Sequence, residues 1–295
     1  MDYKGQHILS TKQFDKDGLL ELFEETKKME TEGGDLSGKL MATLFYEPST
    51  RTRFSFEAAM NRLGGRVISN ADMISTSSHK KRETLEDTGK VVSKMVDVIV
   101  MRHPEVGSVA KLASKSEVPV INAGDGASQH PTQGLLDIYT VWKERGTLDG
   151  LIWGMVGDLK NSRVFHSQAD LLRHFDVKFV LVSPEGLEMP TDYINGEYRE
   201  SKELASVIGE MDVISSNRIQ EERFGSPEDA EKYKGAFVID EVMMRGVKED
   251  AILLNPLPRV DEITVGVDLD PRAKYFDQVE NGVYVRMALL KKVLE

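Results

Sequence analysis

The chain has 295 residues, 40% of them apolar and 29% charged, with a formal net charge of −11 and no cysteine. This length suits two domains, and the acidic charge argues against wholesale binding to nucleic acid or to an anionic membrane. Without cysteine there are no disulfides, thiolate zinc sites or cysteine nucleophiles. No apolar run approaches the roughly 18 residues that span a bilayer, and the first ten residues do not resemble a signal peptide, so we expect a cytoplasmic protein.

Short β-rich apolar runs alternate with helical patterns along the chain. The predicted strands are 40–46, 96–101, 118–122, 151–156, 178–183, 213–215, 236–240 and 252–254. The predicted helices include 84–94, 131–145, 163–174 and 282–294. Strands that alternate with helices predict parallel sheets covered on both faces.

Two such sets of elements predict an α/β protein with two doubly wound domains, each a mostly parallel sheet flanked by helices. We place the first domain at residues 1–131 and the second at 132–281. The helix 131–145 is expected to connect them, and the last segment, 282–295, is expected to pack back on the first domain.

Residues 46–56, YEPSTRTRFSF, predict a helix start with Ser49 as N-cap. Arg51 and Arg53 lie in the first turn, where the helix dipole disfavours positive charge. Arg53 has a structural explanation, an ion pair with Glu57 one turn later. The segment Ser49, Thr50, Arg51 and Thr52 combines backbone amides, hydroxyls and a cation. An ordinary capped helix with surface arginines is the alternative, but this combination is typical of a phosphate site.

Ligands of parallel α/β sheets gather beyond the carboxyl ends of the strands. Polar clusters follow six predicted strands, and five of the clusters contain arginine, a local excess of positive charge in an acidic chain. The clusters are 49–52, 102–104, 122–133, 157–163, 217–220 and 255–259. Each has a plainer explanation: His130, for example, could be a structural loop histidine, and Arg102 a surface arginine. The stretch LIWGMVGDLK lacks G-x-G-x-x-G and gives little support for a nicotinamide cofactor.

Several of these pieces resemble one family in order and over nearly the whole chain. FYEPSTRTRFSFE, MRHP, NAGDGASQHPTQGLLD, MVGDLK, NRIQEER and NPLPRVDEI are similar to the aspartate/ornithine carbamoyltransferase family, and within it to the catalytic chains of the aspartate enzymes. The absence of an H-C-L-P stretch separates this chain from the ornithine enzymes.

The resemblance implies transfer of the carbamoyl group of carbamoyl phosphate to L-aspartate, the committed step of pyrimidine synthesis, without cofactor or metal. It implies that Arg51, Thr52, Arg102 and His130 are catalytic. It further implies that carbamoyl phosphate is bound by Ser49, Thr50, Arg51, Thr52, Arg102, His130, Gln133, Pro256 and Leu257. The residues that it assigns to aspartate are Arg163, Arg218 and Gln220, together with Lys81 of a neighbouring subunit.

The segment SSHKKRETLED (77–87), which contains a pair of lysines, looks like a solvated loop running into a helix when read by itself. In the family, the matching serine and lysine, here Ser77 and Lys81, reach into the neighbouring subunit's site. The resemblance therefore implies a homotrimer with shared active sites, and a separate regulatory chain is possible.

The chain departs from the family at four positions, Asn161, Val164, Asn217 and Asn255, where relatives usually carry tyrosine, threonine, threonine and histidine. We expect weaker aspartate binding in consequence. The alternatives are a carbamoyltransferase with another amine acceptor, a catalytically silent assembly subunit, and a dehydrogenase-like nucleotide-binding protein. Arg218 and Gln220 disfavour a cationic acceptor such as ornithine.

Overall fold

A computed structural model describes residues 3–77 and 81–295 of the chain. The chain divides into two units: Met1–Leu136 with Val279–Glu295, and Asp137–Gln278. The divisions fall inside the helices α6 (Pro131–Arg145) and α9 (Tyr275–Leu294). The sequence boundaries were placed at residues 131 and 281, one at the start of α6 and the other inside α9.

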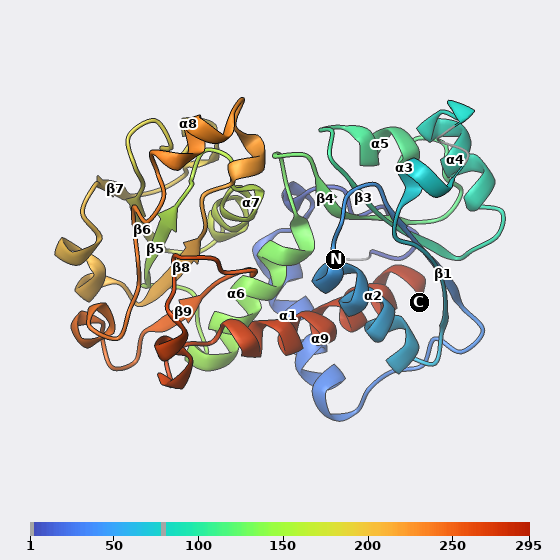
Figure 1. Ribbon diagram of the computed structural model, residues 1–295. Helices are drawn as coiled ribbons and strands as arrows, with labels where there is room; N and C mark the ends of the chain where they lie inside the picture. Colours follow the sequence, from blue (N-terminus) through green and yellow to red (C-terminus); the bar gives the residue numbers. More distant parts are fainter. Residues whose placement is uncertain (1–2, 78–80) are drawn as a thin grey trace. The chain divides into compact units, whose positions relative to one another are not determined.

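The first unit is a parallel sheet with helices on both faces (Figure 1). Within its described residues the strand order is β2-β1-β3-β4. The strands are β1 (Leu40–Phe45), β2 (Arg66–Asn70), β3 (Val98–His103) and β4 (Val120–Asp125). Its helices, apart from α6 and α9, are α1 (Lys16–Thr31), α2 (Thr50–Arg62), α3 (Met73–Thr76), α4 (Leu85–Val92) and α5 (Ser108–Ala113).

Alternate residues of β1 identify what covers each face of this sheet, because side chains in a strand point to opposite sides in turn. Ala42 and Leu44 pack with Val109 and Leu112 of α5 in one buried cluster. Thr43 points the other way and donates a hydrogen bond to Glu57 of α2 at 3.1 Å. Helix α9 lies beside α1 and α2: Lys291 pairs with Glu25 at 2.9 Å, and Arg286 donates to Ser55 at 2.9 Å.

The second unit is a parallel sheet with the strand order β7-β6-β5-β8-β9 in its described residues (Figure 1). The strands are β5 (Ile152–Gly157), β6 (Lys178–Val182), β7 (Tyr198–Ser201), β8 (Val213–Asn217) and β9 (Ile252–Leu254). Its further helices are α7 (Arg163–Leu172) and α8 (Pro227–Glu231), together with several short 3₁₀ turns.

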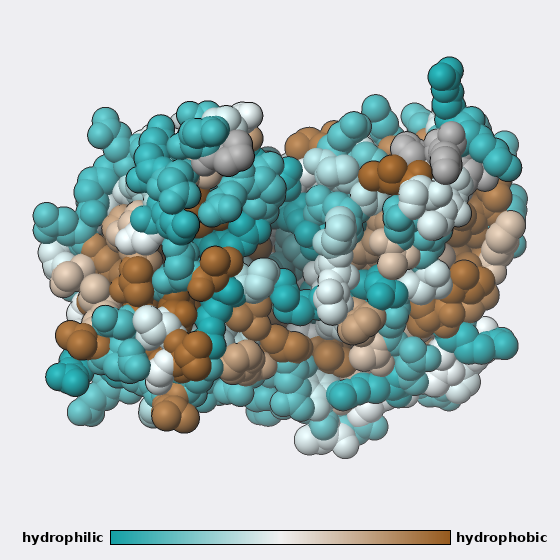
Figure 2. Space-filling view, in the orientation of Figure 1, coloured by the Kyte–Doolittle hydropathy of each residue, from teal (hydrophilic) through white to brown (hydrophobic). Residues whose placement is uncertain are grey.

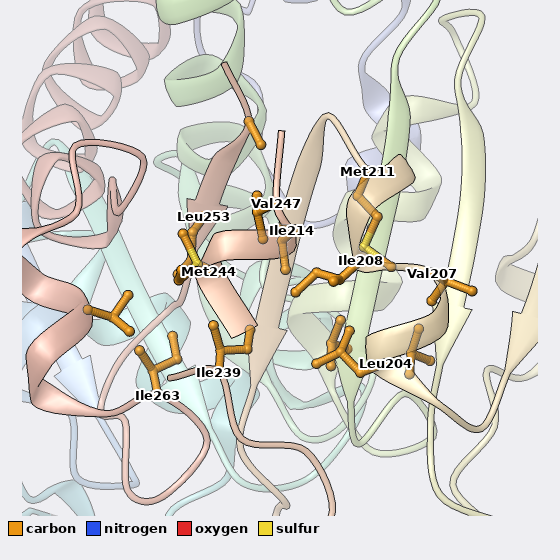
Figure 3. Packing of buried hydrophobic residues seen from close by; sticks show 14 of the residues in the cluster. Leu204, Val207, Ile208, Met211, Ile214, Ile239, Met244, Val247, Leu253 and Ile263 are labelled. Atoms are coloured by element: carbon orange, nitrogen blue, oxygen red, sulfur yellow. The ribbon is translucent and has the colours of Figure 1, made fainter. Parts of the chain in front are cut away.

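One face of this sheet is covered by the 3₁₀ turns and loops rather than by long helices. Figure 3 shows Ile214 of β8 and Leu253 of β9 packed against side chains of these segments, which include Ile208, Met211 and Met244. On the other face Ser215 of β8 accepts a hydrogen bond from Gln168 of α7 at 3.0 Å.

The predicted fold class is confirmed, with two parallel sheets flanked by helices. The predicted strand 236–240 is wrong. Its backbone bonds to the loop that follows β9: the Ile239 amide donates to Glu262 and the Thr264 amide donates to Ile239. Only an isolated bridge between Ile239 and Ile263 results. The edge strands β2 and β7 were not predicted, because their polar sequences RVISN and YRES lack a buried apolar run.

On the surface, hydrophobic residues reach the visible face of each unit only in small patches among hydrophilic ones (Figure 2). Among the helices of the described residues, none combines the length and the hydropathy needed to cross a membrane. The cytoplasmic location stays a prediction.

Candidate active site

In the first unit, Arg102 at the end of β3 is fastened to the loop that begins α2. Phe45 of β1 is the register partner of Arg102, so the ends of β1 and β3 lie side by side. The Arg102 guanidinium donates through Nη1 to Ser49 Oγ at 3.1 Å, and its Nε lies 2.5 Å from Glu47 Oε1. The arginine is therefore held beside the first turn of α2 and retains only 16% side-chain exposure.

The first turn of α2 has several features that favour an anion. Ser49 is its N-cap residue, as predicted, but within the described residues its hydroxyl makes no capping hydrogen bond to the helix. The first amides of a helix have no partner within the helix itself and carry the positive end of its dipole. Thr50 and Arg51 of this turn are exposed, whereas Thr52 is buried. Amides, hydroxyls and guanidinium groups thus lie together, an arrangement that favours phosphate oxygens.

His130 reaches the same turn from the loop between β4 and α6. Both His130 and Thr52 are buried, and His130 Nε2 lies 3.3 Å from Thr52 Oγ1. The residue directly precedes α6, and its carbonyl accepts the amide of Gln133 at 3.0 Å. Four of the predicted residues, Ser49, Thr52, Arg102 and His130, are therefore linked in two hydrogen-bonded pairs at one helix start.

Arg53 has the structural role that the sequence indicated. Its guanidinium pairs with Glu57 at 3.1 Å and also donates to Ser69 of β2 at 3.0 Å. Glu57 accepts from Thr43 of β1 as well. This arginine joins α2 to the sheet, whereas Arg51 two residues earlier is exposed.

In the second unit, Asp158 holds two loops together at the carboxyl ends of β5 and β8. Its carboxylate accepts the backbone amide of Asn161 at 3.0 Å and that of Gln220 at 3.2 Å. Asp158 is fully buried. One side chain therefore fixes the loop that leads to Arg163 at the start of α7 and the loop that carries Arg218.

A second link between these loops joins Asn217 to Ser162, with Nδ2 of the asparagine 2.7 Å from Oγ of the serine. Ser162 is also the N-cap of α7. Glycine is needed at position 157, where φ is 124° and a Cβ atom would lie 2.0 Å from the Asn217 carbonyl oxygen. The strand ends can approach this closely only because Gly157 has no side chain.

Arg218 forms a two-bond ion pair with Glu222. Nη1 and Nη2 lie 2.9 and 2.6 Å from the two carboxylate oxygens. The hydrogen bonds to Glu222 raise the pKa of Arg218 despite its burial. Burial acts to raise the pKa of Glu222, but the hydrogen bonds and charge of Arg218 lower it below its usual value. Gln220 lies two residues away, and its Nε2 is 3.5 Å from Asn217 Oδ1.

The turn after β9 has an unusual backbone. Leu257 has a φ of 53°, in the left-handed region, and its amide donates to Asn255 Oδ1 at 2.7 Å. Pro256 and Leu257 are half-buried. A leucine in this region is rare and requires surroundings that hold it there.

Ser77 and Lys81 lie on either side of residues 78–80, which are outside the described part of the chain. The Ser77 hydroxyl donates to the Met73 carbonyl, and Lys81 is exposed. Their assignment to a neighbouring subunit's site stays a prediction.

The four departures lie in the second unit: Asn161, Val164 and Asn217 are next to or near Arg163 and Arg218 in the sequence, and Asn255 precedes Pro256. Asn161 Nδ2 donates to both oxygens of Asp158, at 3.1 and 3.0 Å. Val164 is buried in the first turn of α7. Asn217 and Asn255 are buried and hydrogen-bonded through their side chains.

Sequence reasoning missed three acidic residues at these sites: Glu47, Asp158 and Glu222. The spacing of four residues that indicated the Arg53–Glu57 pair also separates Arg218 from Glu222, so the last of them could have been found. Glu47 contacts Arg102, and Asp158 contacts Gln220 in addition to the nearby Asn161. The sheets bring Arg102 and Gln220 near, and the sequence gives no signal for these two contacts. Across the described residues, no group of three or more His, Cys, Asp or Glu side chains is arranged to hold a metal ion.

Comparisons with known proteins agree on one family. The family model for the aspartate/ornithine carbamoyltransferase carbamoyl-P binding domain matches residues 6–143, and that for the Asp/Orn binding domain matches residues 149–293. An aspartate carbamoyltransferase from Oryza sativa is 47% identical over 97% of this chain and 84% of its own. The aspartate carbamoyltransferase catalytic subunit of Methanopyrus kandleri is 47% identical over 99% of this chain and 98% of its own.

A solved structure shows the same fold. Aspartate transcarbamoylase from Trypanosoma cruzi in complex with carbamoyl aspartate and phosphate superposes with a TM-score of 0.94 and is 38% identical, covering 99% of this chain and 97% of the other.

Proposed function

Because the chain belongs to the aspartate/ornithine carbamoyltransferase family, we propose that it transfers the carbamoyl group of carbamoyl phosphate to the amino group of L-aspartate. The products are N-carbamoyl-L-aspartate and phosphate, and the reaction serves pyrimidine synthesis. The near-complete coverage of relatives that carry the name aspartate carbamoyltransferase supports aspartate as the acceptor.

The reaction depends on fixed positive charges and on the placement of the two substrates rather than on a cofactor or metal ion. The neutral amine of aspartate attacks the carbonyl carbon, a C–N bond forms, and the carbonyl oxygen becomes an oxyanion. The C–O bond to phosphate then breaks, and the departing phosphate takes the proton from the amine. Both substrates are anions, so fixed cations must overcome their mutual repulsion and hold them in place for attack.

The start of α2 binds the phosphoryl group in this proposal. The backbone amides and hydroxyls of Ser49, Thr50 and Thr52 surround the phosphate oxygens, and Arg51 supplies the positive charge. This explains why an arginine is placed at the end of a helix where the dipole disfavours it.

The carbonyl oxygen is stabilised by three side chains, Thr52, Arg102 and His130. Donors that are already in place when the oxyanion forms lower the barrier because they need no reorganisation. The Arg102–Ser49 and Thr52–His130 contacts keep these side chains together at the start of α2. This convergence is the observation that carries the proposal. Gln133 contacts the carbamoyl amino group, and the turn at Pro256 and Leu257 presents its carbonyl groups to the same substrate.

Aspartate is bound in this proposal by Arg163, Arg218 and Gln220. A guanidinium fork matches a carboxylate with two parallel hydrogen bonds, which a lysine cannot make. Arg218 already binds the Glu222 carboxylate in this geometry. The same group is therefore shaped for a substrate carboxylate.

The test is carbamoyl transfer from carbamoyl phosphate to L-aspartate and to L-ornithine in parallel, with detection of the ureido product. We expect product with aspartate alone. Product with ornithine would keep the phosphate site but overturn the acceptor. A folded protein that gives no product with either would instead favour a catalytically silent assembly subunit.

We also propose that the active form is a homotrimer in which Ser77 and Lys81 complete the site of a neighbouring subunit. Its support is the family membership and the exposure of Lys81. Mixing Arg51→Ala chains with Lys81→Ala chains should restore part of the activity, because some hybrid sites contain both native residues. Hybrid trimers that form without recovery of activity would contradict shared sites.

A further inference from the structure

A hydrogen-bonded network of buried polar side chains extends through the second unit to the turn after β9. The carboxylate of Asp137 in α6 accepts hydrogen bonds from Gln278 Nε2 at 2.7 Å and from Gln168 Nε2 at 2.6 Å. Oε1 of Gln278 accepts the backbone amide of Asn255 at 2.9 Å. All four residues are at most 2% exposed.

The network continues through the Asn255 side chain. Its Oδ1 accepts the Leu257 amide at 2.7 Å, and its Nδ2 donates to Glu262 Oε1 at 2.9 Å. The other oxygen of Glu262 accepts the Val260 amide at 2.9 Å. Three backbone amides of the loop, at residues 255, 257 and 260, are thus held by buried side chains.

The chemistry of the partners fixes the orientation of each side-chain amide in this network. A backbone N–H needs an acceptor and a carboxylate needs a donor, so Gln278 must turn Oε1 to Asn255 and Nε2 to Asp137. By the same reasoning Asn255 turns Oδ1 to Leu257 and Nδ2 to Glu262. The two terminal hydrogen bonds, to Asp137 and Glu262, are buried, and a hydrogen bond is stronger away from water.

The network ends at a backbone segment whose conformation is unfavourable by itself. Leu257 has a φ of 53°, a conformation that a side chain disfavours and that persists only where neighbouring groups enforce it. The Leu257 amide is fixed by Asn255, whose own amide is fixed by Gln278.

From this arrangement we infer that Gln278, oriented by Asp137, is a positioning residue for the turn 255–258, an inference that rests on the proposed function of that turn. It contacts no substrate in this account. It acts by fixing where the carbonyl groups of Pro256 and Leu257 point, and thus how carbamoyl phosphate is held. The supporting residues come from α6 and α9, far from the turn in sequence.

The comparison of Gln278→Met with Gln168→Met tests this inference in the full chain. Both substitutions replace a buried glutamine that donates to Asp137 with a methionine of similar volume. Of the two glutamines, only Gln278 also holds the turn. We expect Gln278→Met to raise KM for carbamoyl phosphate and lower kcat, with a combined fall in kcat/KM of about 10- to 100-fold. Gln168→Met should stay within about threefold of the native value. If Gln278→Met does not fold, Gln278→Asn keeps the amide but shortens its reach.

Hydrogen exchange at the Leu257 and Val260 amides supplies a readout that does not depend on activity. Faster exchange in the Gln278 variant than in the Gln168 variant supports the inference, even if the native chain fails to transfer carbamoyl groups and the proposed function falls. Equal exchange and equal kinetic losses in the two variants would overturn it, because the network would then serve stability alone.

Discussion

Arg218 and Glu222 form an ion pair in which both terminal nitrogens of the guanidinium meet both oxygens of the carboxylate, at 2.9 and 2.6 Å. In the proposed function the same guanidinium group binds a substrate carboxylate through two parallel hydrogen bonds. The ion pair also fixes the side chain beside Gln220, whose backbone amide is bound by Asp158.

Arg218→Lys should therefore weaken aspartate binding. An ammonium group is a point charge and cannot form two parallel bonds to one carboxylate. We expect KM for aspartate to rise by about tenfold or more, while the affinity for carbamoyl phosphate changes little. Steady-state kinetics with each substrate varied in turn provide the measurement. Arg199→Lys is the control, because Arg199 is an exposed arginine of the same unit that pairs with Glu210. An unchanged KM in the Arg218 variant would remove this residue from the aspartate site.

Arg51→Gln and Arg53→Gln separate binding from structure within one helical turn. Loss of a hydrogen-bonded charge at the phosphate costs about 1.5–3 kcal/mol, so Arg51→Gln should lower the affinity for carbamoyl phosphate roughly 10- to 150-fold. Arg53→Gln breaks the pair with Glu57 and should lower stability while leaving that affinity nearly unchanged. Calorimetric titration and thermal unfolding measure the two effects. Equal affinities in the two variants would contradict the role of Arg51.

Val164→Thr tests the expectation that aspartate binding is weaker than in relatives with threonine. The added hydroxyl lies in the first turn of α7, next to Arg163, and can donate one hydrogen bond there. We expect KM for aspartate to fall about threefold. The control is Val177→Thr, since Val177 is equally buried in the same unit but lies outside the site. If KM stays at the native value, the valine does not weaken aspartate binding.

Asp268→Asn should remove a contribution to the free energy of unfolding that depends on pH in the acid range. Hydrogen bonds from Arg259, one of them 2.7 Å long, lower the pKa of Asp268 below its usual value, although burial opposes them. A carboxyl whose pKa is lowered by folding contributes stability above its unfolded pKa of about 3.9 and loses that contribution as the pH falls through the folded pKa.

The pair is partly exposed, so we expect the variant to be only about 1 kcal/mol less stable at pH 7. The difference should vanish as the pH falls well below 4. Urea unfolding at pH 7, 5 and 3 measures it, with Asp192→Asn at an exposed position as the control. A difference that persists unchanged at pH 3 would show that the charge of Asp268 is not its source.

Local patterns in the sequence were sufficient to predict the alternation of strands and helices and the polar clusters beyond the strands. A buried parallel strand is a short apolar run, and its carboxyl end faces the ligand side whatever its neighbours are. For this reason the clusters that contain Arg51, Arg102, His130, Arg163 and Arg218 could be identified from the sequence, whereas the role expected of each residue came from the resemblance to the family. The Arg53–Glu57 pair was predictable because both residues lie on one helix.

Contacts between distant segments were decided only by the tertiary structure. Asp137 and Gln278 are separated by 141 positions, and nothing in either local sequence identifies the other as its partner. Asp158 reaches Gln220, and Glu47 reaches Arg102, because neighbouring strands bring them together. The segment 236–240 has the composition of a strand, yet its hydrogen bonds go to the loop after β9. Local composition determines which residues are able to pair, whereas the packing of whole elements determines which of them do.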